Sequence, residues 1–186
     1  MPSSKVSIRP DVKHFLWFNI DSKEFRRALG DDTLFHMDES PVSYLEHWQT
    51  MEIEFYRSSA GKVSAIPDIS QRYGRLFISQ DAHAALHPLI DSCGEFLPVT
   101  YNKMHGYIFN VLTLSDDALD LNLCKKNQWG EIDWIAFDEQ KLQDSPLFRI
   151  EYDNYMGVYC NKQFKKACED AGLQDVRFSP DLSGAP

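Results

Sequence analysis

Two stretches of the chain, residues 76–98 and 158–180, repeat one pattern. They read "LFISQDAHAALHPLIDSCGEFLP" and "VYCNKQFKKACEDAGLQDVRFSP", and each begins with an apolar triplet that suits a short buried strand. A small polar residue, Ser79 or Asn161, follows the triplet and can accept a hydrogen bond from the first turn of a helix. Further side chains then recur at the same spacing, as Ala85, Phe96 and Pro98 and as Ala167, Phe178 and Pro180. The pattern predicts two strand–helix–strand units.

Neither unit carries the residues of a catalytic cassette. No nucleophile stands beside a base, and there is no glycine-rich loop of the kind that binds phosphate. Gly94 and Gly172 are placed to end the two helices, and Pro88 is expected to kink or restart the first one. We therefore interpret the repeat as a scaffold that is used twice.

The rest of the chain is rich in strand patterns. The segment "MEIEFYR" alternates apolar residues with glutamate, which is typical of a half-buried strand. The segment 101–114 predicts a hairpin with Gly106 in its turn. Further strands are expected in residues 11–20, 130–139 and 146–152, and a short helix in residues 22–29.

These elements predict an α+β fold with a mixed or mostly antiparallel sheet. We expect residues 1–70 to form a strand and helix region packed on a main domain of residues 71–181, with residues 182–186 as a tail.

The charge balance bears on the kind of partner. The chain has 28 acidic and 19 basic residues and a net charge of −9. Binding of nucleic-acid phosphates requires clustered Lys and Arg, and the nearest candidates, residues 125–126 and 165–166, are only pairs. We expect no direct contact with nucleic acid. An acidic surface suits a basic partner, although it can also serve solubility alone.

The sequence offers one metal-like pattern. His83 and His87 in "HAALH" stand one helical turn apart and can share a zinc ion, with Cys93 as a candidate third ligand. The glutamate of the HExxH motif is absent, so a solvated helix face is the other interpretation. A small metal-dependent hydrolase is thus one alternative function, but we expect no metal, no cofactor and no enzymatic activity.

Acidic and aromatic residues concentrate in the segment 115–134. Asp116, Asp117 and Asp120 in "SDDALD" could act as carboxylates for a metal or for acid–base catalysis. Alternatively, Asp116 and Asp117 open a turn or a first helical turn. Trp129 lies in the polar segment "KKNQWGE", and we expect its side chain to be exposed.

No feature directs the chain to a membrane or to an oxidising compartment. No apolar run approaches the ~20 residues that span a bilayer, and the N-terminus lacks the apolar core of a secretory signal. The four cysteines show no CxxC spacing, so reduced thiols and a cytoplasmic protein are expected.

An ordered series of short motifs between residues 76 and 180 resembles a known family. The series runs "FLPV" at 96–99, "YIFNVL" at 107–112, "DALD" at 117–120, "LFRI" at 147–150, "VYCNKQFKKA" at 158–167 and "FSP" at 178–180. It resembles the immunity proteins of bacterial polymorphic toxin systems, and in particular immunity family eleven, the myxobacterial-type immunity protein domain.

The resemblance implies a protein that binds a cognate protein toxin and inhibits it by occlusion, without catalytic residues of its own. The toxin would be a secreted effector, encoded by the adjacent gene, and a nuclease is one candidate because its substrate groove is positive. We expect the toxin to contact Trp129 and the densest acidic region near it, namely Asp116, Asp117, Glu131 and Asp133. A structural adaptor subunit is a further alternative, and the oligomeric state is left open.

Overall fold

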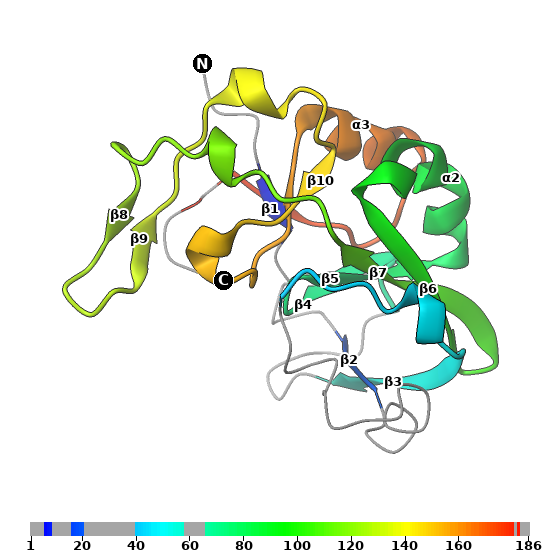
Figure 1. Ribbon diagram of the computed structural model, residues 1–186. Coiled ribbons are helices and arrows are strands. Elements are labelled where there is room, and N and C mark those ends of the chain that lie inside the picture. The colour runs from blue at the N-terminus through cyan, green and yellow to red at the C-terminus, as the bar shows by residue number, and fades with distance from the viewer. Residues whose placement is uncertain (1–5, 9–15, 21–39, 58–65, 181, 183–186) are drawn as a thin grey trace.

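The computed structural model describes residues 6–8, 16–20, 40–57, 66–180 and 182 of the 186-residue chain. Within these residues the fold is α+β: two α-helices, a six-stranded sheet, a four-stranded sheet and a separate two-stranded hairpin (Figure 1). The larger sheet is mixed and mostly antiparallel, so the predicted fold class is confirmed.

The larger sheet has the strand order β2-β3-β6-β7-β5-β4. Neighbouring strands are antiparallel except β3 and β6, which are parallel. The bounds are β2 (Leu16–Ile20), β3 (Met51–Arg57), β4 (Ile69–Arg72), β5 (Arg75–Ser79), β6 (Gly94–Tyr101) and β7 (Met104–Val111).

The smaller sheet has the order β10-β11-β1-β12, and all its neighbouring strands are antiparallel. Its strands are β1 (Val6–Ile8), β10 (Leu147–Phe148), β11 (Tyr159–Cys160) and β12 (Phe178–Ser179). Strands from the first 72 residues therefore belong to both sheets. The division of the chain into residues 1–70 and 71–181 stays a prediction.

Both predicted strand–helix–strand units are present, and each is split by a third strand. In the first unit α2 (Gln80–Ile90) connects β5 to β6, and β7 lies between these two strands. In the second unit α3 (Lys162–Asp170) connects β11 to β12, and β1 lies between them. Because the central strand is antiparallel to both neighbours, the outer strands of each unit run parallel to one another. The two units thus share one topology.

The two helices begin in the same way. The Ser79 hydroxyl accepts a hydrogen bond of 3.1 Å from the N–H of Ala82, and the Asn161 side chain accepts one of 3.1 Å from the N–H of Phe164. Residues three and seven positions after each cap are buried, as one face of a helix requires. These residues are Ala82 and Leu86 in α2 and Phe164 and Cys168 in α3.

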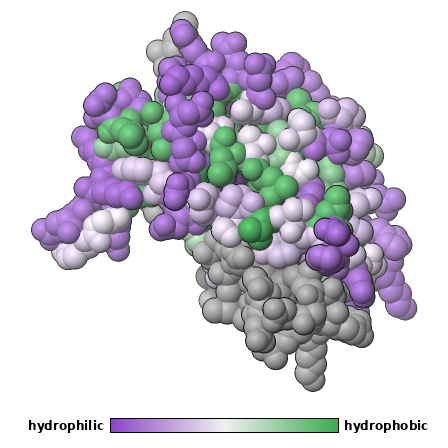
Figure 2. Space-filling model, in the orientation of Figure 1, coloured by the Kyte–Doolittle hydropathy of each residue, from purple (hydrophilic) through white to green (hydrophobic). Residues whose placement is uncertain are grey.

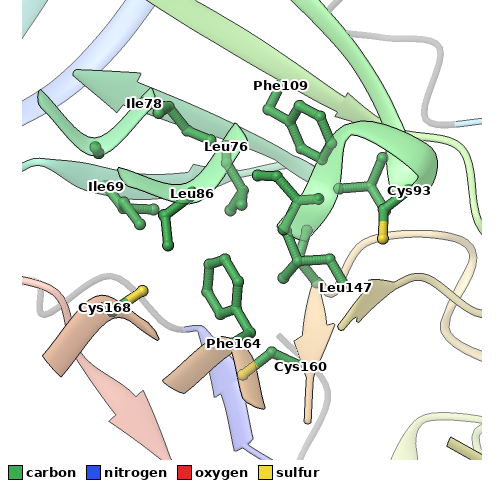
Figure 3. Close-up of a cluster of buried hydrophobic side chains, with 14 residues drawn as sticks. Ile69, Leu76, Ile78, Leu86, Cys93, Phe109, Leu147, Cys160, Phe164 and Cys168 are labelled. Carbon is green, nitrogen blue, oxygen red and sulfur yellow. The ribbon is translucent and has the colours of Figure 1, made fainter. Parts of the chain in front are cut away.

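The units share one hydrophobic core. Helix α2 packs against α3, and Figure 3 shows Phe164 pointing from α3 into a cluster of residues from both sheets. The repeated Phe96 and Phe178 pack at the margin of this cluster. The recurrence of the same side chains at the same spacing therefore reflects two similar units that bury the same kind of face.

The opposite face of the larger sheet carries a second core, around Phe77 and Ile108. The segment 42–48 lies over this face, held by the buried carboxylate of Glu95. That carboxylate accepts hydrogen bonds of 2.7 Å from the Ser43 hydroxyl, 2.7 Å from the Tyr44 N–H and 2.8 Å from the Asn110 side chain.

The expected end of the first helix at Gly94 needs correction. Helix α2 continues through Pro88 to Ile90 without a restart, and a 3-10 turn, η2 (Asp91–Cys93), follows it. Gly94 begins β6 with an extended backbone, and a Cβ there would lie 2.1 Å from the carbonyl oxygen of Asn110. Close approach of two strands, rather than helix termination, thus requires this glycine. Gly172 does end α3, with φ +65° and a hydrogen bond of 3.0 Å from its N–H to Glu169 O.

The hairpin predicted for residues 101–114 is shifted toward the N-terminus: its first strand is β6, its second strand is β7, and its turn is not at Gly106. Asn102 and Lys103 form the turn between β6 and β7, with φ values of 47° and 64°. Gly106 lies within β7, where a Cβ would come within 2.9 Å of ring carbons of Phe77 and Tyr101. Packing of two aromatic rings over the strand explains the glycine.

Other predicted elements are shorter than expected or lie outside the described residues. Strand β3 buries Met51 and Ile53 and exposes both glutamates, as its alternation predicts. The strands expected in residues 130–139 and 146–152 are reduced to β9 (Ile132–Trp134) and β10. The helix predicted for residues 22–29 falls outside the described part of the chain, as does the first half of the strand predicted for 11–20.

Candidate protein-binding surface

A hairpin projects from the body of the molecule (Figure 1). Its paired strands are β8 (Lys125–Lys126) and β9 (Ile132–Trp134), and the pairing continues at its base through a bridge between Leu119 and Phe137. We call residues 119–137 the arm.

The tip of the arm is an ordered turn built around Asn127. The Asn127 Oδ1 atom accepts hydrogen bonds of 2.9 Å from the N–H groups of Trp129 and Glu131, and its Nδ2 atom donates one of 2.7 Å to the Glu131 carboxylate. Gly130 has φ +83°, which a residue with a side chain rarely adopts. Local hydrogen bonds thus fix the position of the Trp129 backbone.

One side of the arm is fixed to the body. Ile132 and Ile135 are buried in a third hydrophobic cluster, together with Phe148 and Tyr159 from the smaller sheet. The Ile135 N–H also donates to Leu182 O at 3.3 Å, close to the C-terminus. The base of the arm is therefore anchored, and only its outer side remains to meet a partner.

The arm exposes four large apolar side chains. The exposed fractions are 76% for Trp129, 66% for Leu121, 58% for Leu123 and 42% for Trp134. The arm holds four of the nine large hydrophobic residues that are exposed in the described part of the chain. Figure 2 shows hydrophobic atoms over the loop that leads into β8, with hydrophilic surface around them. Exposed apolar side chains concentrated on one projecting element indicate a candidate interaction surface, because soluble proteins seldom expose extended apolar patches without a function.

The same region is strongly acidic. Residues 114–144 contain eight acidic and three basic residues, so this sixth of the chain carries more than half of its net charge of −9. Glu131 and Asp133 are exposed on the arm itself, as are Lys125 and Lys126. The arm therefore combines exposed apolar groups with charges of both signs, within a stretch of the chain that is acidic as a whole.

The five residues predicted to contact a partner fall into two sets. Trp129, Glu131 and Asp133 are exposed on the arm, and the expected exposure of Trp129 is confirmed. Asp116 and Asp117 lie beside its base in a 3-10 turn, η3 (Asp116–Ala118). The Asp116 carboxylate accepts hydrogen bonds from the N–H groups at the start of η5 (Glu151–Asp153), at 2.9 and 3.4 Å, so it has a structural role. Asp117 is exposed.

Sequence analysis missed three exposed apolar residues of this surface. Leu121 and Leu123 lie in a polar loop, and that polar context was the signal that could have found them. Trp134 is exposed because an irregularity in the pairing of β8 with β9 breaks the regular alternation of the strand.

His83 and His87, the candidate zinc ligands, lie beside aromatic rings and one carboxylate. The His83 ring stacks on Tyr107 with centroids 4.2 Å apart, and Phe96 meets it edge-on at 4.6 Å. Burial lowers the pKa of His83, and the neighbouring His87 lowers it further. The Nε2 atom of His87 lies 3.5 Å from the Asp91 carboxylate. Among the described residues, no group of three His, Cys, Asp or Glu side chains is arranged to hold a metal ion.

A buried polar cluster is the other feature that the sequence did not reveal. Arg75 and Arg149 are buried, and burial together with the charge of Arg75 lowers the pKa of Arg149 to about 10. Asp153 is also buried, and its carboxylate accepts hydrogen bonds of 2.7 Å from the Tyr159 hydroxyl and 3.0 Å from the Gly157 N–H. Burial raises the pKa of Asp153 to about 6. The cluster joins the two sheets in the interior, so we interpret it as structural.

No protein-family model matches the sequence, and no curated protein matches it. None of the helices in the described residues has the length and apolar character needed to cross a bilayer.

Proposed function

We propose that this protein is a bacterial immunity protein that acts in the cytoplasm, where it binds a protein toxin and inhibits it by covering the toxin's active site. The observation that carries the proposal is the arm, which exposes tryptophan and leucine side chains within an acidic stretch of the chain, residues 114–144. A surface of this kind favours capture of another macromolecule, because aromatic anchors supply much of the binding energy in protein interfaces.

The positions of the motifs that resemble immunity family eleven support a separation between a scaffold and a partner-binding segment. They fall on the scaffold: "FLPV" in β6, "YIFNVL" along β7, and "VYCNKQFKKA" across β11 and α3. Most of the arm lies between the motifs "DALD" and "LFRI". In this proposal the motifs specify the fold, and the segment between them specifies the partner.

Co-expression with the product of the adjacent gene tests the proposal. The neighbouring protein should be toxic when produced alone in a bacterial host, and this chain should restore growth. The two purified proteins should form a complex of fixed stoichiometry, which light scattering after size-exclusion chromatography can measure. A neighbouring product that is harmless alone, or the absence of a complex, would contradict the proposal.

A further inference from the structure

The tip of the arm is organised before any partner binds. Both the Trp129 and the Glu131 N–H groups donate to one side-chain oxygen of Asn127, and the Asn127 N–H donates to Glu131 O at 2.8 Å. A fixed turn loses little conformational entropy when it binds, so more of the contact energy remains as affinity.

Trp129 is the most exposed of the large hydrophobic side chains in the described residues. Its position at the end of a projecting hairpin allows it to enter a concave surface, whereas a residue on the flat body of the molecule could not (Figure 1). Tryptophan is also enriched among the residues that dominate binding energy.

The charges on the arm bear on the chemistry of the partner surface. Glu131 and Asp133 are exposed on the β9 side of the tip, Lys125 and Lys126 are exposed on β8, and the exposed Asp117 lies near the base. A negative surface attracts a positive one and raises the rate of association with it. A second copy of this chain fits poorly, since each copy carries a net charge of −9.

We infer that the arm enters a cleft of the partner protein that has an apolar floor and a basic rim, with Trp129 in the floor and Glu131 and Asp133 against the rim. This inference rests on the proposed function, and it assigns the contact site and the chemistry of the partner surface.

The experiment measures binding kinetics between this chain and the purified product of the adjacent gene, at about 50 mM and about 500 mM salt. The arm variants are Trp129→Ala and the double charge reversal Glu131→Lys with Asp133→Lys. Asp133→Lys alone is a second charge variant that leaves the hydrogen bonds of the tip in place. Thermal unfolding verifies that each variant is folded.

Two control variants match the arm variants in chemistry. Met104→Ala removes an exposed apolar side chain from the turn end of the β6–β7 hairpin. Glu52→Lys with Glu169→Lys reverses two exposed carboxylates on β3 and α3, and it changes the net charge by the same amount as the double arm variant. Local and whole-molecule charge effects are thereby separated.

Trp129→Ala should weaken the complex by about 30-fold or more, mainly through faster dissociation. The double charge reversal on the arm should slow association by about tenfold at low salt and by much less at high salt. Both controls should stay within about twofold of the wild type at the same salt concentration.

Three results would contradict the inference, and they differ in what they contradict. If the wild type binds and the arm variants bind like their controls, the contact lies elsewhere, although the proposed function stands. If the free chain is a dimer that Trp129→Ala dissociates, the arm serves self-association. If the wild type forms no complex at all, the proposed function itself fails and the inference fails with it.

Discussion

At the scale of single residues, the carboxyl group of Asp153 links stability to pH. Burial raises its pKa from 3.8 to about 6, against the hydrogen bonds from Tyr159 and Gly157 that lower it. Between about pH 4 and pH 6 the folded protein therefore binds more protons than the unfolded chain, and this group's contribution to stability falls as the pH rises. Across the whole window the loss is about 3 kcal/mol.

Substitution of Asp153 by Asn should remove this contribution. The amide cannot ionise, so the free energy of unfolding of Asp153→Asn relative to the wild type should increase by about 3 kcal/mol between pH 4 and pH 7. Urea unfolding of both proteins at several pH values measures the difference. A difference that stays constant with pH, or that decreases, would show that the carboxyl group is not destabilised by burial.

Tyr159→Phe provides a control within the same cluster. The Tyr159 hydroxyl donates a hydrogen bond of 2.7 Å to the Asp153 carboxylate and lowers the pKa of that group. Its removal should therefore shift the pH window upward rather than abolish it.

The Arg75, Arg149 and Asp153 cluster also marks a limit of sequence analysis. The sequence shows the charge of each side chain, but it does not show which charged side chains are buried in the folded protein. Both arginines stand beside apolar residues, in "GRLFI" and "LFRI", which is the one local signal that they are buried. Their proximity depends on the pairing of segments more than seventy residues apart, which no local pattern reports.

At the scale of elements, the two helix caps should differ in their contribution to stability. The Ser79 hydroxyl caps α2 and donates a hydrogen bond of 2.5 Å to Asp68. The Asn161 side chain caps α3, and its Nδ2 atom also donates to Leu142 O at 3.3 Å and Gln143 O at 3.2 Å. Asn161 thus supports both the helix and the segment around η4 (Glu139–Leu142).

Loss of a cap typically costs about 1 kcal/mol, and a lost hydrogen bond between buried groups costs a similar amount. We expect Ser79→Ala to reduce the free energy of unfolding by about 1–2 kcal/mol and Asn161→Ala by about 2–3 kcal/mol. Urea unfolding at one pH compares them, with Ser92→Ala in η2 as a control. Equal losses at the two caps would mean that the bonds to Leu142 and Gln143 add no more than the bond from Ser79 to Asp68.

The elements that the sequence predicted correctly are those with a local cause. Ser79, Asn161 and Gly172 determine where helices begin and end through hydrogen bonds to nearby backbone groups, and the alternation in β3 depends on burial of one face. Gly94 and Gly106 were misplaced because their cause is a neighbour from another strand. The strand inserted into each unit was missed for the same reason, since only the assembled sheets bring it there.

At the scale of the whole molecule, the arm and the body can be tested separately. The arm tip contributes little to the cores: Asn127, Glu131 and Gly130 bond within the tip, and Trp129 is exposed. The buried part of the arm begins at Ile132. Replacement of residues 127–131 by Asn-Gly should close β8 on β9 with a two-residue turn that suits a hairpin.

This replacement should leave the stability of the body within about 1 kcal/mol of the wild type, because no buried apolar surface is lost. Under the proposed function it should nevertheless abolish protection against the adjacent gene product, since the anchor is removed. Urea unfolding measures the first effect, and growth during co-expression measures the second. A change at another exposed hairpin turn, Asn102→Gly with Lys103→Gly between β6 and β7, should leave protection intact. If protection is retained without the tip, the toxin must contact the body of the molecule instead. If the free energy of unfolding falls by more than about 1 kcal/mol, the tip supports the fold.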